Sequence, residues 1–368
     1  MLIYFAVFAY LFLLYILRRN RVKFIDVVLA VLPIFLLTGL KAISVGSDTL
    51  AYYNRYVGAE MMLTEANTIS EPGFNYISFY FHNILGVSFY AFDTAIAAFV
   101  CVILGVFLKK YSDNVYLSVF FYITIGLFTM SMSGLRQMIA ISLCTVPLLF
   151  SNRDETRLKV GSKKWSFQLI IGIVCVLVAY TFHNSALVFL PIMLLLNLRL
   201  TKPQIIIITI IAIFTILVRS ILVNYLAEFA PGRYERYDFK EGYLMNTLML
   251  LIPIVISLFC ALLSKPDHND GKYGRSISLM FIFLALQVMF SNLALSHNQI
   301  ARLGYYFMNS YIILIPFALR SLNRRLRIPA TMIIIVICLV FFYLGTKGGT
   351  LMIDDYKFFW QDSAIPSY

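Results

Sequence analysis

A small set of charged side chains stands beside long apolar stretches of this sequence, and Arg136 is the clearest case. It lies between Ser133-Gly134-Leu135 and Gln137, with apolar runs on both sides. A charge at the edge of a membrane is costly and usually faces a bundle interior or a cavity. Because a guanidinium can bind phosphate oxygens in a bidentate manner, Arg136 is a candidate anion ligand. The alternative is an arginine that reaches for lipid headgroups.

Three further arginines could assist Arg136. Arg302 follows His297-Asn298-Gln299 at the start of an apolar run, where it is either an anion ligand or an interfacial anchor. Arg233 and Arg236 belong to a mixed-charge loop, which taken alone is typical of a solvated connector.

Three residues are candidate proton acceptors. His183 stands at the junction of two apolar runs, followed by Asn184. A histidine can exchange a proton near neutral pH, although one at such a junction is as often a helix cap. Asp48 and Glu71 are the alternative bases.

Tyrosines follow Asp48 at a spacing typical of a helix. Tyr52 and Tyr56 recur at i+4 and i+8 from Asp48, which predicts one shared face, and Tyr53 is adjacent. Aromatic rings beside a carboxylate suit a sugar, which stacks its C–H face and hydrogen-bonds its hydroxyls. The alternative is an N-cap aspartate with an interfacial tyrosine belt.

Metal and disulfide chemistry have weak support. His82, His183 and His297 could converge, but no HExxH pattern or acidic cluster accompanies them. The 5 cysteines fall in apolar runs without a CxxC pair. We therefore expect no metal, no cofactor and no disulfide framework.

These residues must be positioned by membrane helices. The chain has 368 residues, 61% of them hydrophobic and 13% charged, with mean hydropathy +0.83. A soluble domain is nearer one quarter charged. At about 20 apolar residues per span, there is room for about 12 spans. They are expected near 2–17, 24–40, 84–108, 114–131, 133–150, 166–181, 184–199, 204–225, 245–264, 276–295, 300–319 and 328–345.

The predicted fold class is an all-α polytopic integral membrane protein, with one transmembrane domain over 1–368. Roughly two thirds of the 30 Lys and Arg residues fall in alternate short loops, which we take as cytoplasmic. Both termini are then outside, as are the loops near 41–83 and 226–244 and the tail near 346–368. The net charge of +12 is mostly this orientation signal, and no soluble basic module for nucleic acid is present.

Most candidate residues fall on the predicted outer side, and their order there resembles that in the EpsG-like branch of the Wzy-type polysaccharide polymerases. The resemblance covers most of the chain. The segments that carry it are Ser47-Asp48, Tyr52-Tyr53 with Tyr56, Glu71-Pro72-Gly73-Phe74, Ser133-Gly134-Leu135-Arg136-Gln137, Phe182-His183-Asn184-Ser185-Ala186, and Arg302 before Tyr305-Tyr306.

The resemblance implies a glycosyltransferase at the outer face of the bacterial plasma membrane. A growing glycan on undecaprenyl pyrophosphate would move onto a fresh lipid-linked repeat unit, without a metal ion or a nucleotide sugar. Both substrates are lipid-linked oligosaccharides, membrane lipids surround the protein, and a chain-length regulator is left open as a partner.

On this hypothesis, each candidate residue has a role. The bases are His183, Asp48 and Glu71. The pyrophosphate ligands are Arg136, Arg302, Arg233 and Arg236. The sugar contacts are Tyr52, Tyr53, Tyr56, Gln137 and Asn184.

Three other functions compete with the polymerase. A flippase for lipid-linked oligosaccharides also needs a basic cavity, but it commonly shows two pseudo-symmetric halves, and no internal repeat is evident. An O-antigen ligase shares the donor and differs in the acceptor. A membrane O-acyltransferase could use His183, but no inner-side motif suggests a route for an acyl donor.

Overall fold

The computed structural model describes most of the chain as two compact units, and each unit is treated by itself. Unit 1 comprises Met1–Phe150, Glu155–Leu190 and Phe342–Tyr368, and unit 2 comprises Ser151–Asp154 and Pro191–Phe341. The predicted single domain over 1–368 stays a prediction. The described residues are 1–18, 23–64, 71–150, 157–160, 163–196, 198–229, 243–266, 271–295, 300–347 and 351–361.

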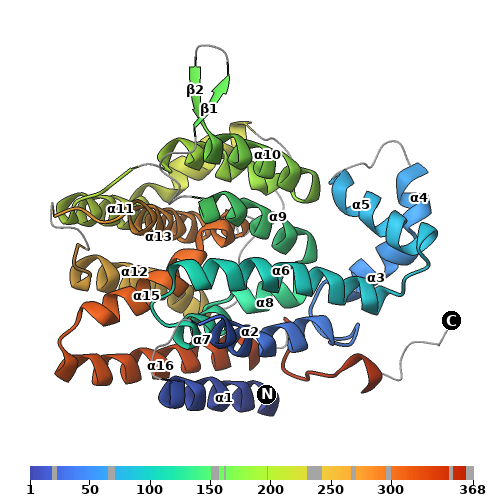
Figure 1. Ribbon diagram of the computed structural model, residues 1–368, viewed down its shortest axis with the longest axis horizontal. Helices are drawn as coiled ribbons and strands as arrows, with labels where there is room; N and C mark the ends of the chain where they lie inside the picture. Colours follow the sequence, from blue (N-terminus) through green and yellow to red (C-terminus); the bar gives the residue numbers. More distant parts are fainter. Residues whose placement is uncertain are drawn as a thin grey trace. The chain divides into compact units, whose positions relative to one another are not determined.

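Unit 1 is built mainly from α-helices (Figure 1). They are α1 (Leu2–Arg18), α2 (Phe24–Gly39), α3 (Thr49–Val57), α4 (Ala59–Thr64), α5 (Pro72–Phe79), α6 (Phe89–Tyr111), α7 (Val115–Thr124), α8 (Leu127–Ser133), α9 (Leu135–Thr145) and α10 (Phe167–Phe182). The π-helix η1 (Tyr80–Ile84) and the 3-10 helices η2 (Val146–Phe150), η3 (Asn184–Phe189) and η7 (Phe359–Gln361) complete it.

The long helix α6 packs against several other helices of unit 1. Its first turn is capped by Ser88, whose Oγ accepts from the Ala91 N–H at 3.3 Å, and its last turn carries Lys109 and Lys110, which complement the helix dipole. Helix α6 packs against α2 and α9, and α9 packs against α10. Helices α3, α4 and α5 lie together near one end of α6 (Figure 1).

Unit 2 is organised around α13. Its elements are η4 (Pro191–Leu195), α11 (Lys202–Phe229), α12 (Tyr243–Leu263), α13 (Arg275–Ala294), α14 (Ala301–Gly304), η6 (Tyr305–Phe307), α15 (Asn309–Ser321) and α16 (Arg324–Lys347) as far as Phe341. Helix α13 packs against α11, α12 and α15. Asn292 of α13 donates to the carbonyl of Ala212 at 3.0 Å and to Thr215 Oγ1 at 2.9 Å, which ties α13 to α11 by polar contacts in an apolar setting.

Several described helices are suited to a membrane. Four of them, α6, α11, α13 and α16, are long and apolar enough to cross a bilayer, and the bent pair α7–α8 makes a fifth if it is counted as one span. Six shorter apolar helices, of 10–17 residues, accompany them. A polytopic membrane protein is therefore supported. The count of about twelve spans and the outer position of both termini stay predictions.

Each predicted span overlaps one or more helices, but several depart from a single regular helix, such as the run near 133–150, where α9 is followed by the 3-10 helix η2. The span expected near 114–131 bends by 60° between α7 and α8, where Gly126 has φ +115°. Glycine has no Cβ and adopts that conformation without strain. The run near 184–199 forms η3 and η4, separated at Pro191, in place of one α-helix. The run near 300–319 starts as α14 and η6 before α15.

One short antiparallel hairpin interrupts the helical pattern. Strands β1 (Arg157–Val160) and β2 (Lys163–Ser166) pair in the predicted basic inner loop before α10. The prediction of an all-α chain therefore misses this hairpin. The sequence Arg157-Leu158-Lys159-Val160 does alternate polar and apolar residues, but four residues are too few to identify a strand between long apolar runs.

The N-terminal and C-terminal segments of unit 1 meet the start of the predicted outer loop. The N-terminal ammonium donates to the Asp354 carbonyl at 2.8 Å, and Tyr4 Oη donates to the Ile353 carbonyl at 2.7 Å. The N–H of Gly46 donates to the Met352 carbonyl at 2.9 Å. The N-terminus and the segment Met352–Asp354 therefore lie beside the start of this loop, and the outer position of both termini stays a prediction.

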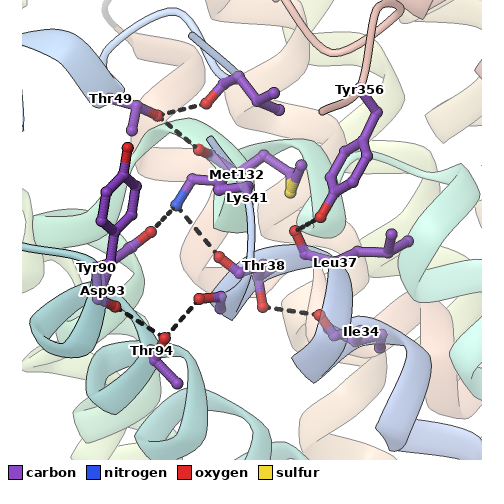
Figure 2. A network of polar contacts seen from close by, with 12 residues as sticks. Ile34, Leu37, Thr38, Lys41, Thr49, Tyr90, Asp93, Thr94, Met132 and Tyr356 are labelled. Carbon is purple, nitrogen blue, oxygen red and sulfur yellow. Dashed lines mark hydrogen bonds and ion pairs between the residues drawn. The ribbon is translucent and has the colours of Figure 1, made fainter. Parts of the chain in front are cut away.

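A buried polar network fixes the chain between α2 and α3 (Figure 2). The ammonium of Lys41 pairs with Asp93 of α6 and donates to the Thr38 carbonyl at 3.3 Å. Both Lys41 and Asp93 are almost fully buried. At the start of α3, Thr49 Oγ1 donates to the Val45 carbonyl at 2.6 Å and to the Met132 carbonyl at 3.3 Å. The network therefore ties α3 to α2, α6 and α8.

Breaking this pair is expected to destabilise unit 1. Asp93→Ala leaves the Lys41 ammonium buried without a counter-charge, which costs about 3–5 kcal/mol of unfolding free energy. The double variant Lys41→Met, Asp93→Leu removes both charges and should recover most of that loss. Thermal unfolding of the detergent-solubilised protein measures this, and a double variant as unstable as Asp93→Ala would contradict it.

Candidate functional site: a carboxylate shared by an arginine and a histidine

Glu71 joins three segments that are far apart in the sequence. It precedes α5 and is 7% exposed. Its Oε2 accepts from Arg136 Nη1 at the start of α9. Its Oε1 faces His183 Nδ1 at 2.5 Å and accepts from the backbone N–H of Asn184 at 3.3 Å. Both carboxylate oxygens are therefore occupied, and the candidate cation Arg136 and candidate base His183 share one partner.

The backbone around Glu71 is specialised for this contact. Glu71 itself has φ +63° and ψ +60°, in the left-handed region, and Pro72 begins α5. A Cβ added at Gly73 would lie 2.4 Å from Thr181 Oγ1 and 3.1 Å from the Thr181 backbone. A glycine therefore lets the first turn of α5 approach the end of α10, which directly precedes His183.

Gly73→Ala is expected to weaken the site. The added methyl group must push α5 away from α10, so the contact of Glu71 with His183 lengthens and the activity of the protein falls. Gly345→Ala is the matched control, because nothing lies within 4 Å of its Cβ and α16 should gain slightly from alanine. Thermal unfolding and surface-glycan profiles compare the two variants, and equal behaviour would contradict the role of Gly73.

Arg136 is held from two sides. Its guanidinium lies 5.5 Å from the centre of the Tyr52 ring, within cation–π range, and its Nε donates to Tyr52 Oη at 3.5 Å. The ring of Tyr52 in turn contacts Phe74, with 5.3 Å between centroids. The Arg136 side chain keeps 24% of its surface exposed. It is thus oriented by the protein and still reachable from solvent.

The charge state of Glu71 determines which ring nitrogen of His183 carries the proton. Burial alone would raise the pKa of Glu71, but the hydrogen bond and the charge of His183, the charge of Arg136 and the Asn184 N–H outweigh burial and lower the pKa. Glu71 is therefore ionised at neutral pH and can only accept hydrogen bonds. Nδ1 of a neutral His183 must then carry the proton, which leaves Nε2 with a lone pair. A carboxylate that orients a histidine base in this manner is familiar from catalytic triads.

The sequence of this chain matches the family model of the EpsG family over residues 24–358. That match covers nearly the whole chain. The chain belongs to the EpsG family. A search of the curated proteins and a search of the solved structures found no match. EpsG membership indicates a membrane protein with a polysaccharide polymerase-type function.

Other predicted site residues of this EpsG-family chain lie around the cluster. Asp48 is exposed at the N-cap of α3 and within electrostatic reach of Arg136. Gln137 is buried beside Arg136. Tyr53 is half-buried against Phe89, with 5.5 Å between ring centres.

Tyr56 has a different environment from Tyr52. It is 1% exposed and stacks on Phe92, and its hydroxyl donates to the Val87 carbonyl at 2.7 Å. The predicted helix that places Tyr52 and Tyr56 on one face is confirmed as α3, and both residues are buried. The sugar-binding roles stay predictions.

The structure does not place the other predicted arginines relative to this cluster. Arg302 is exposed on α14 in unit 2. Arg233, Arg236 and His297 lie outside the described residues. In the described part of the chain, no group of three or more His, Cys, Asp or Glu side chains is placed to hold a metal ion.

Two residues beside the cluster were missed in the sequence. Arg55 of α3 donates from Nε to Asn75 Oδ1 of α5 at 3.0 Å. Burial and the charge of Arg136 lower the pKa of Arg55, and the charge of Glu71 acts in the opposite direction. The available signal was the i+3 spacing of Arg55 from Tyr52, which places both on neighbouring helix positions.

An apolar cavity of about 330 Å³ lies between α5–η1, α6, α9 and α10 in unit 1. Its walls include Ile77, Phe99, Ile139, Leu143 and Phe182. Ile139 and Leu143 follow Arg136 by three and seven residues on α9, so they lie on the same helix face within about two turns. Phe182 directly precedes His183. The cavity therefore begins next to the polar cluster.

Proposed function

We propose that this chain is a repeat-unit polymerase that transfers a growing glycan from undecaprenyl pyrophosphate onto the sugar of a fresh lipid-linked repeat unit. The reaction takes place at the outer face of the bacterial plasma membrane. Family membership supports the polymerase class. The observation that carries the reaction is the Glu71 cluster, because it joins a phosphate-binding cation to a proton acceptor.

His183 is the proposed general base. Its Nε2 takes the proton from the acceptor hydroxyl, and the freed oxygen bonds to the anomeric carbon of the donor glycan. The bond from that carbon to the pyrophosphate oxygen breaks, and its electron pair leaves with the pyrophosphate. Glu71 holds the His183 ring, and Asp48 is the second candidate base.

Arg136 is the proposed ligand of the leaving group. It neutralises the charge that develops on the pyrophosphate, and a guanidinium that is already oriented does so without reorganisation. Arg302, Arg233 and Arg236 complete the clamp in this proposal. Asp48 or Glu71 could stabilise the oxocarbenium-like transition state, as carboxylates do in glycosidases.

A lipid-linked donor is supported by the apolar cavity next to the cluster. Its lining is almost wholly apolar, which suits a hydrocarbon chain whose charged head stays at Arg136. The sugars would extend to the exposed side, where Asp48 and Tyr53 lie, with Tyr52, Tyr56, Gln137 and Asn184 as the further proposed contacts.

Glycan gel profiles of a deletion strain, with and without the restored gene, test the polymerase. We expect the ladder of the deletion strain to collapse to a single repeat unit on its final acceptor. Loss of all surface glycan, single units included, would favour a flippase or a ligase. An unchanged ladder would contradict the pathway altogether.

The purified protein tests the donor directly. Given lipid-linked repeat units alone, it should form longer lipid-linked glycans and release undecaprenyl pyrophosphate. Neither a nucleotide sugar nor a divalent metal is required, so EDTA should leave the rate unchanged. A rate that vanishes with EDTA would contradict the metal-independent mechanism.

A further inference from the structure

A second guanidinium, Arg55, lies beside the cluster with hydrogen-bonding capacity to spare. Asn75 accepts from its Nε at 3.0 Å, and Asn75 is itself 1% exposed, so the guanidinium is tethered at one edge by a buried amide. Within the described residues, neither Nη group of Arg55 has a hydrogen-bond partner. An arginine fork offers five N–H donors, so most of those of Arg55 remain for a ligand.

The carboxylate of Glu71 attracts Arg55 electrostatically but accepts no hydrogen bond from it. Its two oxygens are taken by Arg136, His183 and the Asn184 N–H. Asp48 is the other carboxylate within electrostatic reach of Arg136, and it is exposed to solvent, where its charge is screened. Arg55 stands three residues after Tyr52 on α3, and Tyr52 contacts Arg136 through its ring and its hydroxyl. Two guanidinium groups are therefore held around one buried carboxylate, and a bound anion would neutralise the positive charge that remains.

We propose that Arg55 and Arg136 together form a phosphate site that binds the two phosphoryl groups of a pyrophosphate-bearing ligand. This inference rests on the proposed function for the identity of the ligand, and it adds a residue for which that function gave no role. Arg136 binds one phosphoryl group beside His183, and the open Nη edge of Arg55 binds the other. Asn75 is a positioning residue, because it fixes the plane of the Arg55 fork. Both arginines belong to unit 1.

Binding of inorganic pyrophosphate and of inorganic phosphate to the purified protein in lipid nanodiscs tests this site. The unmodified protein should bind pyrophosphate more tightly than phosphate. Arg55→Gln should weaken pyrophosphate binding by roughly 10- to 100-fold, since it removes a charge-assisted contact, and should reduce the preference for pyrophosphate. Arg55→Lys should lose part of the affinity, because it keeps the charge without the fork. Arg324→Gln, an exposed arginine of α16, is the matched control and should bind as the unmodified protein does.

The outcomes separate this inference from the proposed function. Unchanged pyrophosphate affinity in both Arg55 variants overturns the site, even if the protein polymerises normally. If the Arg55 variants bind pyrophosphate more weakly but the unmodified protein forms no polymer, the phosphate site is upheld and the polymerase proposal is overturned. If Arg55→Gln does not fold, as judged by thermal unfolding, Arg55→Lys decides the question. In an active protein, the KM for the lipid-linked donor should rise in Arg55→Lys more than kcat falls.

Discussion

Arg136→Ala is expected to abolish polymer formation while the protein still inserts into the membrane. The variant removes the cation that neutralises the leaving pyrophosphate, and loss of one preorganised transition-state contact costs roughly 100- to 1000-fold in rate. It also leaves Glu71 with His183 and the Asn184 N–H as its partners. Unfolding free energy should fall by about 1–3 kcal/mol, as is typical when a hydrogen-bonded charge loses its partner. Glycan gels of the complemented deletion strain measure the first effect.

Arg136→Lys refines this test. Lysine keeps the positive charge but lacks the fork that reaches Glu71 and the ligand together, so we expect partial activity with shortened chains. Arg324→Ala controls for the loss of a positive charge elsewhere in the chain. Chains of normal length from Arg136→Ala, at normal protein abundance, would show that Arg136 is not the pyrophosphate ligand.

Glu71→Gln is expected to be the second most damaging change. The amide has the same size, but it loses the charge that pairs with Arg136 and orients the Nδ1–H of His183. We expect a rate loss of roughly 10- to 100-fold, comparable to that from a misplaced base. Radiolabelled repeat units given to the purified protein measure it. Glu60→Gln, at an exposed carboxylate of α4, is the control and should retain full activity.

The difference in stability between the unmodified protein and Glu71→Gln is expected to depend on pH. Because the pKa of Glu71 is lowered in the folded protein, its ionised form contributes stability at all pH values above its ordinary range. That contribution is lost as the pH falls through the lowered pKa. The gap in unfolding temperature between the unmodified protein and Glu71→Gln should therefore persist from pH 8 to pH 5 and narrow only below about pH 4. A gap that closes near pH 6 would contradict an ionised, acceptor-only Glu71.

Much of the fold could be predicted from the sequence, because lipid imposes long apolar runs on a helix. Every predicted span overlaps helical structure, and α6, α13 and α16 agree with their predicted bounds within a few residues. The bend between α7 and α8 was missed because it depends on one glycine in an apolar run. The separation of η3 from η4 was missed because the run near 184–199 was taken as one span although Pro191 lies within it.

The residues of the candidate site could be selected from the sequence, but the contacts between them could not. Glu71, Arg136 and His183 were each selected for chemistry, yet nothing in their spacing indicates that one carboxylate serves both partners. Such contacts span 65 and 112 residues, and only the packing of α5 on α10 creates them.

Two charged residues with partners far away in the sequence, Arg55 and Lys41, were also overlooked. Arg55 was passed over because only Asp48 and the tyrosines were selected from the predicted helix that became α3. The partner of Asp93 was also missed. A lone carboxylate inside a predicted span requires a partner, so Lys41 could have been sought.

The left-handed backbone at Glu71 has a consequence for the history of the protein. A glutamate there carries a conformational cost that glycine would not have, of about 1 kcal/mol or more, and asparagine tolerates the same φ better. Selection for heat resistance alone would therefore drift toward glycine or asparagine at this position and lose the enzyme in the process. An acidic residue in so unfavourable a conformation is therefore expected where selection favours activity over robustness.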